Sequence, residues 1–277
     1  MSIPFGACVH RAIYLSAFVL LGLGACHRDE PQPPAPEAKS QEDTLVVFAA
    51  TSLRDAFTAI GEAWKRAHPG VEITFNFAGT QELRTQLEQG AAVDVFASAD
   101  QRHMDELVQA GRAATPVLIA RNEPVIVVSK EAAEKIRGLA DLPRASRLVI
   151  GAPEVPIGRY TLQILDRAAT KLGPDYRARV EAKVASRELN VRQVLAKVKL
   201  GEAEAGFVYR TDAQSAPELT VLTIPSELNV IAEYPMAVVS GAPHPAAARA
   251  WVEFARSDSG RSTLEHAGFL LPATPSP

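Results

Sequence analysis

The chain has 277 residues with 29 basic and 32 acidic side chains, which give a formal net charge of −3 at pH 7. No run of basic residues with interleaved aromatic residues occurs, so nothing in the composition indicates a nucleic-acid partner. Once the N-terminal segments described next are set aside, the remaining length suffices for two modest α/β lobes, each with one hydrophobic core.

Residues 1–25 have the layout of a secretory signal peptide. Arg11 precedes an apolar stretch over residues 12–24, which is shorter than the ~20 residues that a membrane-spanning helix needs. The stretch ends in Leu-Gly-Ala-Cys26, which resembles a bacterial lipobox, where cleavage leaves the cysteine as the lipidated first residue. We therefore predict that Cys26 anchors the protein to a membrane surface. A buried hydrophobic helix and a disulfide between Cys8 and Cys26 are the alternatives.

The segment that follows the predicted cleavage site is polar. It reads HRDEPQPPAPEAKSQED up to Asp43 and contains no aliphatic residue larger than alanine. Such a segment cannot bury a core. We predict a flexible linker over residues 26–43 and a folded region that begins at Thr44.

From Thr44 onward, short β-rich runs alternate with helical patterns, an order typical of parallel sheets covered by helices. In the first helical pattern, apolar residues from Leu53 to Ala67 recur at spacings of three and four, and Pro69-Gly70 ends it. Further helices are expected over residues 81–89, 101–110, 160–172, 191–200 and 246–255. The expected strands are TLVVFAA, VEITFNFA, VDVFASA, PVIVVS, RLVIGA, AGFVYR and YPMAVV, of which only the last breaks the alternation.

Four strand-to-helix junctions place a hydroxyl, a glycine or a small polar residue where a helix begins. Helix N-termini attract anions, and in open α/β sheets the ligand crevice lies beyond the carboxyl ends of the strands. The four junctions could therefore converge on one anion site. For any one of them, an ordinary helix cap is the alternative. They lie at residues 49–53 with Ser52, at 78–81 with Gly79 and Thr80, at 153–158, and at Asn190-Val191.

Catalytic motifs are missing from the sequence. There is no G-x-S-x-G elbow, no phosphate-binding G-x-x-x-x-G-K-[ST] loop and no H-E-x-x-H helix, and the six histidines are scattered. Asp94 and Asp100 flank the run VFASA and could form an acid/base pair, although Asp100 is better placed to cap a helix. We expect no enzyme activity, no cofactor and no bound metal ion.

The chain resembles the periplasmic molybdate-binding proteins of bacterial ABC importers, which are class II solute-binding proteins. The resemblance covers residues 44–269. It implies a two-lobed, type II periplasmic-binding-protein fold, in which each lobe is a mainly parallel sheet flanked by helices and the ligand cleft lies between the lobes. The segments that carry it include VFAATSLRDAF, FAGTQELRTQLEQGAAVDVFASADQRHMDEL, GAPEVPIGRYTLQIL, NVRQVLAKVKLGEAEAGFVYRTDA and EYPMAVV.

By position, the resemblance implies five ligand residues for the oxyanion. Ser52 and Thr80 would donate through hydroxyl and backbone N–H groups, Ile157 and Val191 through backbone N–H groups, and Tyr209 through its phenol. Thr80 stands where the family often has serine, and Ile157 stands where it has a small residue. The alternative for Tyr209 is a half-buried aromatic residue whose hydroxyl faces water.

Three arginines directly follow ligand positions: Arg54, Arg159 and Arg192. They could add a positive field, but we expect them to face solvent or the other lobe and not to contact the anion. The lobes are expected to comprise residues 44–121 with 233–277 and residues 122–232, with hinge crossings near 120–123 and 231–235.

The resemblance also implies a function. A monomer in the periplasm or cell envelope would capture molybdate, and tungstate with it, close around the anion, and dock on a membrane permease. Both anions are fully ionised tetrahedral dianions, so their site needs donors and no acceptors. A site for protonated phosphate would need a carboxylate, and sulfate would have to be excluded by size.

Several different functions stay open at this point. The ligand could be sulfate, phosphate, or a ferric ion held by tyrosines, although no adjacent Tyr-Tyr pair occurs among Tyr160, Tyr176, Tyr209 and Tyr234. A periplasmic hydrolase with Ser52 as nucleophile would need a base, and no histidine is near the site segments in sequence. The effector-sensing domain of a transcription factor shares this architecture but would not carry an export signal.

Overall fold

The structure, a computed structural model, describes residues 44–273. The predicted signal peptide over 1–25, the linker over 26–43 with its lipidation site Cys26, and residues 274–277 lie outside the described residues. Within the described part of the chain, no helix is both long enough and apolar enough to cross a membrane.

The first five-stranded sheet has the order β2-β1-β3-β10-β4. β1 pairs in parallel with β2 and β3, whereas β10 runs antiparallel to β3 and β4, so four of the five strands point the same way. Its strands are β1 (Thr44–Ala50), β2 (Glu72–Ala78), β3 (Val95–Ala97), β4 (Val117–Asn122) and β10 (Ala232–Val238).

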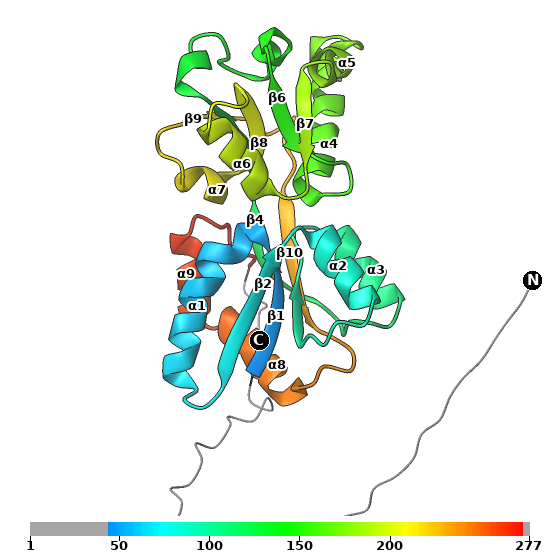
Figure 1. Cartoon of the computed structure of the whole chain (residues 1–277), viewed down its shortest axis with the longest axis vertical. Coiled ribbons are helices and arrows are strands. Elements are labelled where there is room, and N and C mark those ends of the chain that lie inside the picture. Colours follow the sequence, from blue (N-terminus) through cyan, green and yellow to red (C-terminus); the bar gives the residue numbers. More distant parts are fainter. Residues whose placement is uncertain (1–43, 274–277) are drawn as a thin grey trace, which may run out of the picture. The chain divides into compact units, whose positions relative to one another are not determined.

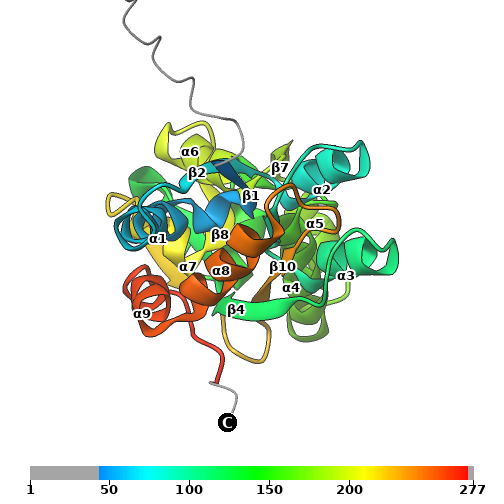
Figure 2. The ribbon, with the colours of Figure 1, turned by 90° about the horizontal axis from the view of Figure 1, so that it is seen from below.

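Helices cover both faces of this sheet. Figures 1 and 2 show α1, α8 and α9 on one side and α2 and α3 on the other. Buried strands in such a position are apolar on both faces, which is why residues of β1 alternate between two cores: Leu45 and Val47 belong to one and Phe48 to the other. The helices are α1 (Arg54–Ala67), α2 (Thr80–Glu88), α3 (Gln101–Gln109), α8 (Pro245–Arg256) and α9 (Asp258–His266).

The second five-stranded sheet has the order β7-β6-β8-β5-β9, and β5 is its one reversed strand. Its strands are β5 (Pro124–Val128), β6 (Leu148–Gly151), β7 (Val184–Glu188), β8 (Ala205–Tyr209) and β9 (Thr220–Thr223). Its helices are α4 (Pro156–Leu172), α5 (Tyr176–Glu181), α6 (Val191–Lys199) and α7 (Arg210–Gln214), with short 3₁₀ turns at Lys130–Ala132 and Leu139–Arg144.

The chain passes between the sheets at two places. β4 ends at Asn122 in the first sheet and β5 begins at Pro124 in the second, so Glu123 alone separates them. The chain returns to the first sheet at Ala232, the first residue of β10 and the pairing partner of Asn122. The two crossings therefore lie side by side, which makes this pair of strands the connection between the two sheets.

All seven expected strands and all six expected helices form. The elements that the sequence analysis missed are β4, β7, β9, α5, α7 and α9. β7 alternates partly buried and exposed residues before the buried Glu188, and it is an edge strand rich in polar residues. α4 begins at Pro156 and not near residue 160, because proline is well accommodated in the first turn of a helix, where its missing N–H has no partner to lose.

Candidate functional site

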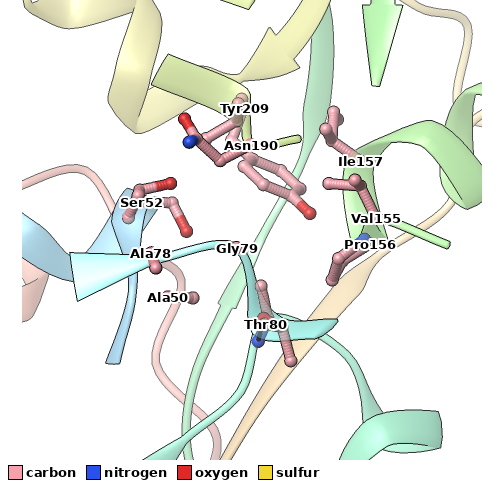
Figure 3. Close-up of a pocket in the computed structure, with 13 residues that line it drawn as sticks. Ala50, Ser52, Ala78, Gly79, Thr80, Val155, Pro156, Ile157, Asn190 and Tyr209 are labelled. Carbon is pink, nitrogen blue, oxygen red and sulfur yellow. Dashed lines mark hydrogen bonds between the residues drawn. The ribbon is translucent and has the colours of Figure 1, made fainter. Parts of the chain in front are cut away.

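One pocket collects residues from all four predicted junctions. Its cavity volume is about 10 Å³, whereas pockets for organic ligands measure roughly 300–1,000 Å³. The pocket therefore suits a small ion better than an organic molecule. All five predicted ligand residues line it, namely Ser52, Thr80, Ile157, Val191 and Tyr209, and Figure 3 shows Tyr209 with its hydroxyl turned into the space among Ser52, Thr80 and Ile157.

Ser52 lies in the 3₁₀ turn η2 (Thr51–Leu53), between the end of β1 and the start of α1. Its side chain caps neither element, so the helix-cap alternative for this residue is wrong. The Ser52 hydroxyl is buried and lies 3.0 Å from the hydroxyl of Tyr234 on β10. Tyr234, on the strand that returns to the first sheet, therefore hydrogen-bonds this pocket residue without lining the pocket itself.

Thr80 is the first residue of α2 and is also buried. Its Oγ1 accepts a hydrogen bond from the Ala99 N–H at 3.2 Å, so its own hydrogen is left for another acceptor. Gly79, just before it, allows close approach of the second lobe, because a Cβ there would lie 2.3 Å from the Leu189 carbonyl oxygen. The helix is capped by Glu82, which accepts from the Gly79 N–H at 2.9 Å.

Ile157 and Val191 stand in the first turns of α4 and α6. The first N–H groups of a helix have no partner within it, so both residues present backbone donors. The Ile157 side chain is buried against Gly151 of β6. α4 sits close to β6 because Gly158 has no side chain; a Cβ there would lie 2.0 Å from the Ala152 carbonyl oxygen.

Tyr209 ends β8, and its side chain is only 1% exposed. The alternative of a half-buried ring with its hydroxyl in water is therefore wrong. The hydroxyl is buried and has no hydrogen-bond partner, an arrangement that costs free energy unless a ligand supplies one. Burial, and then the neighbouring Tyr234 and Tyr160, hold the pKa of Tyr209 well above its ordinary value, so the phenol stays protonated and can donate.

No charged side chain lines the pocket. Arg159 pairs with Asp100 at 3.2 Å, across the two lobes. Arg54 lies over the Phe77 ring at 4.6 Å from its centre. Together with the pairing of Arg192 described next, this confirms that the three arginines face the other lobe or the surface.

Arg192 bridges two carboxylates. Its guanidinium lies 2.7 Å from Asp55 on α1 and 2.6 Å from the fully buried Asp212 on α7. Burial raises the pKa of Asp212 to about 6, although the Arg192 charge opposes this shift. The Arg192 charge is therefore paired with these two carboxylates, of which Asp55 belongs to the opposite lobe.

Further hydrogen bonds join the lobes on both sides of the pocket. Gln81 Nε2 donates to the Leu189 carbonyl oxygen at 2.7 Å. His103 Nε2 lies 2.9 Å from the Glu154 carbonyl oxygen, and the Tyr160 hydroxyl donates to that of Ala99 at 3.3 Å. Sequence reasoning found no histidine near the site segments, because His103 and Glu154 are far apart in the chain.

The two aspartates considered as an acid/base pair have structural partners instead. Asp100 accepts from the His103 N–H at 3.0 Å, which confirms the predicted helix cap. Asp94 accepts from the N–H groups of Val46 and His244 at 2.8 and 2.7 Å. Neither lines the pocket. Within residues 44–273, no group of three or more His, Cys, Asp or Glu side chains could hold a metal ion.

Comparisons with known proteins agree with this architecture. The family model described as bacterial extracellular solute-binding protein matches residues 45–270. The molybdate-binding protein ModA of Mycobacterium tuberculosis is 41% identical over 261 residues, which are 93% of this chain and 96% of that protein. The putative ABC transporter substrate-binding lipoprotein YvgL of Bacillus subtilis is 30% identical over 230 residues, 82% of this chain and 86% of the relative.

A solved structure of the substrate binding domain of a putative molybdenum ABC transporter from Clostridium difficile is 28% identical, with a TM-score of 0.62 over 83% of this chain and 99% of that one. The predicted two-lobed α/β fold and the predicted family resemblance are thereby confirmed. This chain belongs to the family of bacterial extracellular solute-binding proteins.

Proposed function

We propose that the protein is the solute-binding component of a molybdate ABC importer, which captures molybdate, and tungstate with it, and delivers the anion to a membrane permease. The observation that carries the proposal is the pocket lined by Ser52, Thr80, Ile157, Val191 and Tyr209 without any charged side chain. The 41% identity to a protein named for molybdate binding supports the choice of ligand.

The polarity of the pocket favours a fully ionised anion. Ala99 already occupies an acceptor position of Thr80, and Tyr209 is a protonated phenol without a partner, so both hydroxyls are available as donors. A protonated phosphate would have to donate a hydrogen to an acceptor, and no carboxylate lines the pocket. Sulfate has the same charge and shape at a smaller size, so discrimination against it depends on the size of the pocket.

Ferric-ion binding and ester or amide hydrolysis fit the pocket less well. A ferric ion prefers charged oxygen ligands, but burial disfavours the ionised form of Tyr209 and no other tyrosine lines the pocket. A hydrolase with Ser52 as nucleophile needs a base within hydrogen-bond reach, and the partner of Ser52 is the phenol of Tyr234. We therefore propose binding without catalysis and without a cofactor or structural metal ion.

Binding would proceed by closure of two lobes, residues 44–121 with 233–277 and residues 122–232, about the two adjacent crossings. The ion pair of Arg192 with Asp55 and the cross-lobe hydrogen bonds would then form as the anion is enclosed. Loss of water from the cleft would strengthen every donor in it.

We further propose that the mature protein is a monomer held on a membrane surface in the periplasm or cell envelope by lipids on Cys26. The name of the Bacillus subtilis relative, a lipoprotein, supports the anchor.

The proposed ligand is tested by calorimetric titration of the mature, detergent-solubilised protein with molybdate, tungstate, sulfate and phosphate. We expect submicromolar binding of molybdate and tungstate and negligible binding of sulfate and phosphate. Tight binding of sulfate would identify sulfate as the ligand in place of molybdate. No heat of binding with any of the four anions would refute an oxyanion function.

Replacing Tyr209 by phenylalanine should weaken molybdate binding by about 1 kcal/mol or more, because a donor to a charged ligand is lost. The ligand-free variant should be as stable as the wild type or more so, since the removed hydroxyl has no partner.

Tyr176→Phe is the matched control for this measurement. The Tyr176 hydroxyl is buried but donates to the Leu139 carbonyl oxygen, away from the pocket. This variant should lose stability in thermal unfolding and keep its affinity. Equal affinities of the Tyr209 variant and the wild type would remove Tyr209 from the site.

Asp55→Asn should weaken molybdate binding by a factor of about 1.4 to 5 at low ionic strength, because a partly exposed cross-lobe ion pair contributes roughly 0.2–1 kcal/mol. The effect should fade at high salt. Glu62→Gln removes the same charge from α1 but breaks only a pair with Lys65 in that helix, so its affinity should not fall. The same affinity change in both variants would exclude a role of Asp55 in closure.

Cys26→Ser should move the protein from the membrane fraction to the soluble fraction of the cell envelope, because the thiol that carries the lipids is lost. Fractionation followed by mass spectrometry of the N-terminal peptide checks this. If the wild type carries no acyl chains, the anchor is refuted while the ligand proposal is unaffected.

A further inference from the structure

The first crossing between the sheets lies against the segment that carries Tyr209. In the register of the second sheet, Pro124 of β5 is opposite Tyr209, the last residue of β8. The contact continues by one residue on each chain, since the Arg210 N–H donates to the Glu123 carbonyl oxygen at 2.9 Å. The backbone that carries a pocket residue is therefore bonded directly to the crossing.

Asn122 adds a side-chain hydrogen bond to this contact. Its Nδ2 donates to Thr211 Oγ1 at 2.8 Å, and both side chains are buried. The amide orientation is set by the backbone, because the Glu123 N–H donates to Asn122 Oδ1 at 2.9 Å and leaves the amide nitrogen to face Thr211. Loss of the Thr211 acceptor would leave a buried donor without its partner, which costs free energy.

The two ends of this bond belong to different sheets. Asn122 is the last residue of β4 and pairs with β10 in the first sheet, whereas Thr211 lies in α7, which contacts β5 and β8 of the second. The Tyr209 ring has neighbours on both sides as well. Its centre is 5.9 Å from that of Tyr234 on β10 and 6.5 Å from that of Tyr160 on α4. Tyr209 and the Asn122–Thr211 bond therefore lie beside the connection between the sheets.

No hydrogen bond within the described part of the chain holds the Tyr209 hydroxyl itself. The direction in which the phenol points is therefore set by the packing of its ring and by the backbone that carries it. That backbone runs from the end of β8 directly into α7, where Thr211 is the second residue. A bond that fixes Thr211 to the crossing thus also fixes the place of the phenol.

We propose that the Asn122–Thr211 hydrogen bond holds the start of α7 against the crossing and so keeps the Tyr209 phenol in its donor position, which makes Asn122 and Thr211 positioning residues for ligand recognition. The inference rests on the proposed function and deepens it. A rotation about the crossings displaces atoms near them least, so this donor stays in place while the lobes close around the anion.

Thr211→Val tests the proposal, because valine has the shape of threonine but cannot accept from Asn122. Molybdate affinity, measured by calorimetry on the mature, detergent-solubilised protein, should fall about fivefold, the effect of one misplaced donor. Thr211→Ser keeps the acceptor and should bind nearly as tightly as the wild type. An unchanged affinity of the valine variant, or an equal loss in the serine variant, would overturn the proposal.

A double-mutant cycle with Tyr209→Phe separates an effect on the phenol from an effect on closure in general. In the Tyr209→Phe background the hydroxyl to be positioned is absent, so Thr211→Val should change the affinity by less than about twofold. Equal weakening in both backgrounds would mean that Thr211 acts through another part of the site, and the proposed role would be wrong.

Tyr176→Phe is the matched control. It removes another buried hydrogen bond among the elements of the second sheet, the one to the Leu139 carbonyl oxygen, away from the crossing. It should lower the unfolding temperature and leave the affinity unchanged. If it weakens molybdate binding as much as Thr211→Val does, the loss of affinity follows stability and the positioning role is refuted.

Thermal unfolding of each ligand-free variant identifies misfolding. Should Thr211→Val not fold, Asn122→Leu takes its place: it removes the donor of the same bond and should again weaken binding only where Tyr209 has its hydroxyl. A wild-type protein that binds no molybdate refutes the proposed function. A wild type that binds, with Thr211 and Tyr209 acting independently, refutes the positioning role alone.

Discussion

The proposed site depends on one constraint: an anion held without a countercharge needs several hydrogen-bond donors and no competing acceptor around it. Backbone N–H groups at helix starts meet this condition without side-chain chemistry, because they have no partner in the helix. Hydroxyl groups meet it only where their oxygens are already occupied. In this fold the Ala99 N–H donates a hydrogen bond to Thr80 Oγ1, and the hydroxyl groups of Tyr234 and Ser52 are hydrogen-bonded to each other. For Thr80, the local geometry thereby leaves the hydroxyl hydrogen available to a ligand.

The same constraint explains the pairing of the arginines. A guanidinium in the pocket would attract any anion of the right charge and would contribute little to selectivity. Arg192 is instead held between Asp55 and Asp212, and Arg159 by Asp100. Two of these pairs join the lobes, so the positive charges serve contact between the lobes. What distinguishes one anion from another is then left to its protonation and its size.

Sequence reasoning succeeded where the signal was local. The runs of β1 and β8 and the helix starts at Thr80 and Val191 are visible in short windows, and these are the places that line the pocket. It missed α9, which is polar and begins at a serine cap, for want of a strong apolar pattern. It left a water-exposed hydroxyl open as the alternative for Tyr209, because burial is decided by packing against Tyr160 and Tyr234 from distant parts of the chain.

Two buried polar residues just outside the pocket could not have been found from sequence for a related reason. Asn122 and Tyr234 stand near the ends of two strands whose pairing joins positions more than a hundred residues apart, as the register of Asn122 with Ala232 shows. Nothing near either residue in the sequence indicates its partner. Their positions follow from topology: β10 pairs with β4 where the chain crosses between the sheets, and Tyr234 of β10 reaches Ser52 at the first pocket junction. A polar residue buried at such a crossing is therefore a better candidate for tuning the proposed site than a charged residue at its rim.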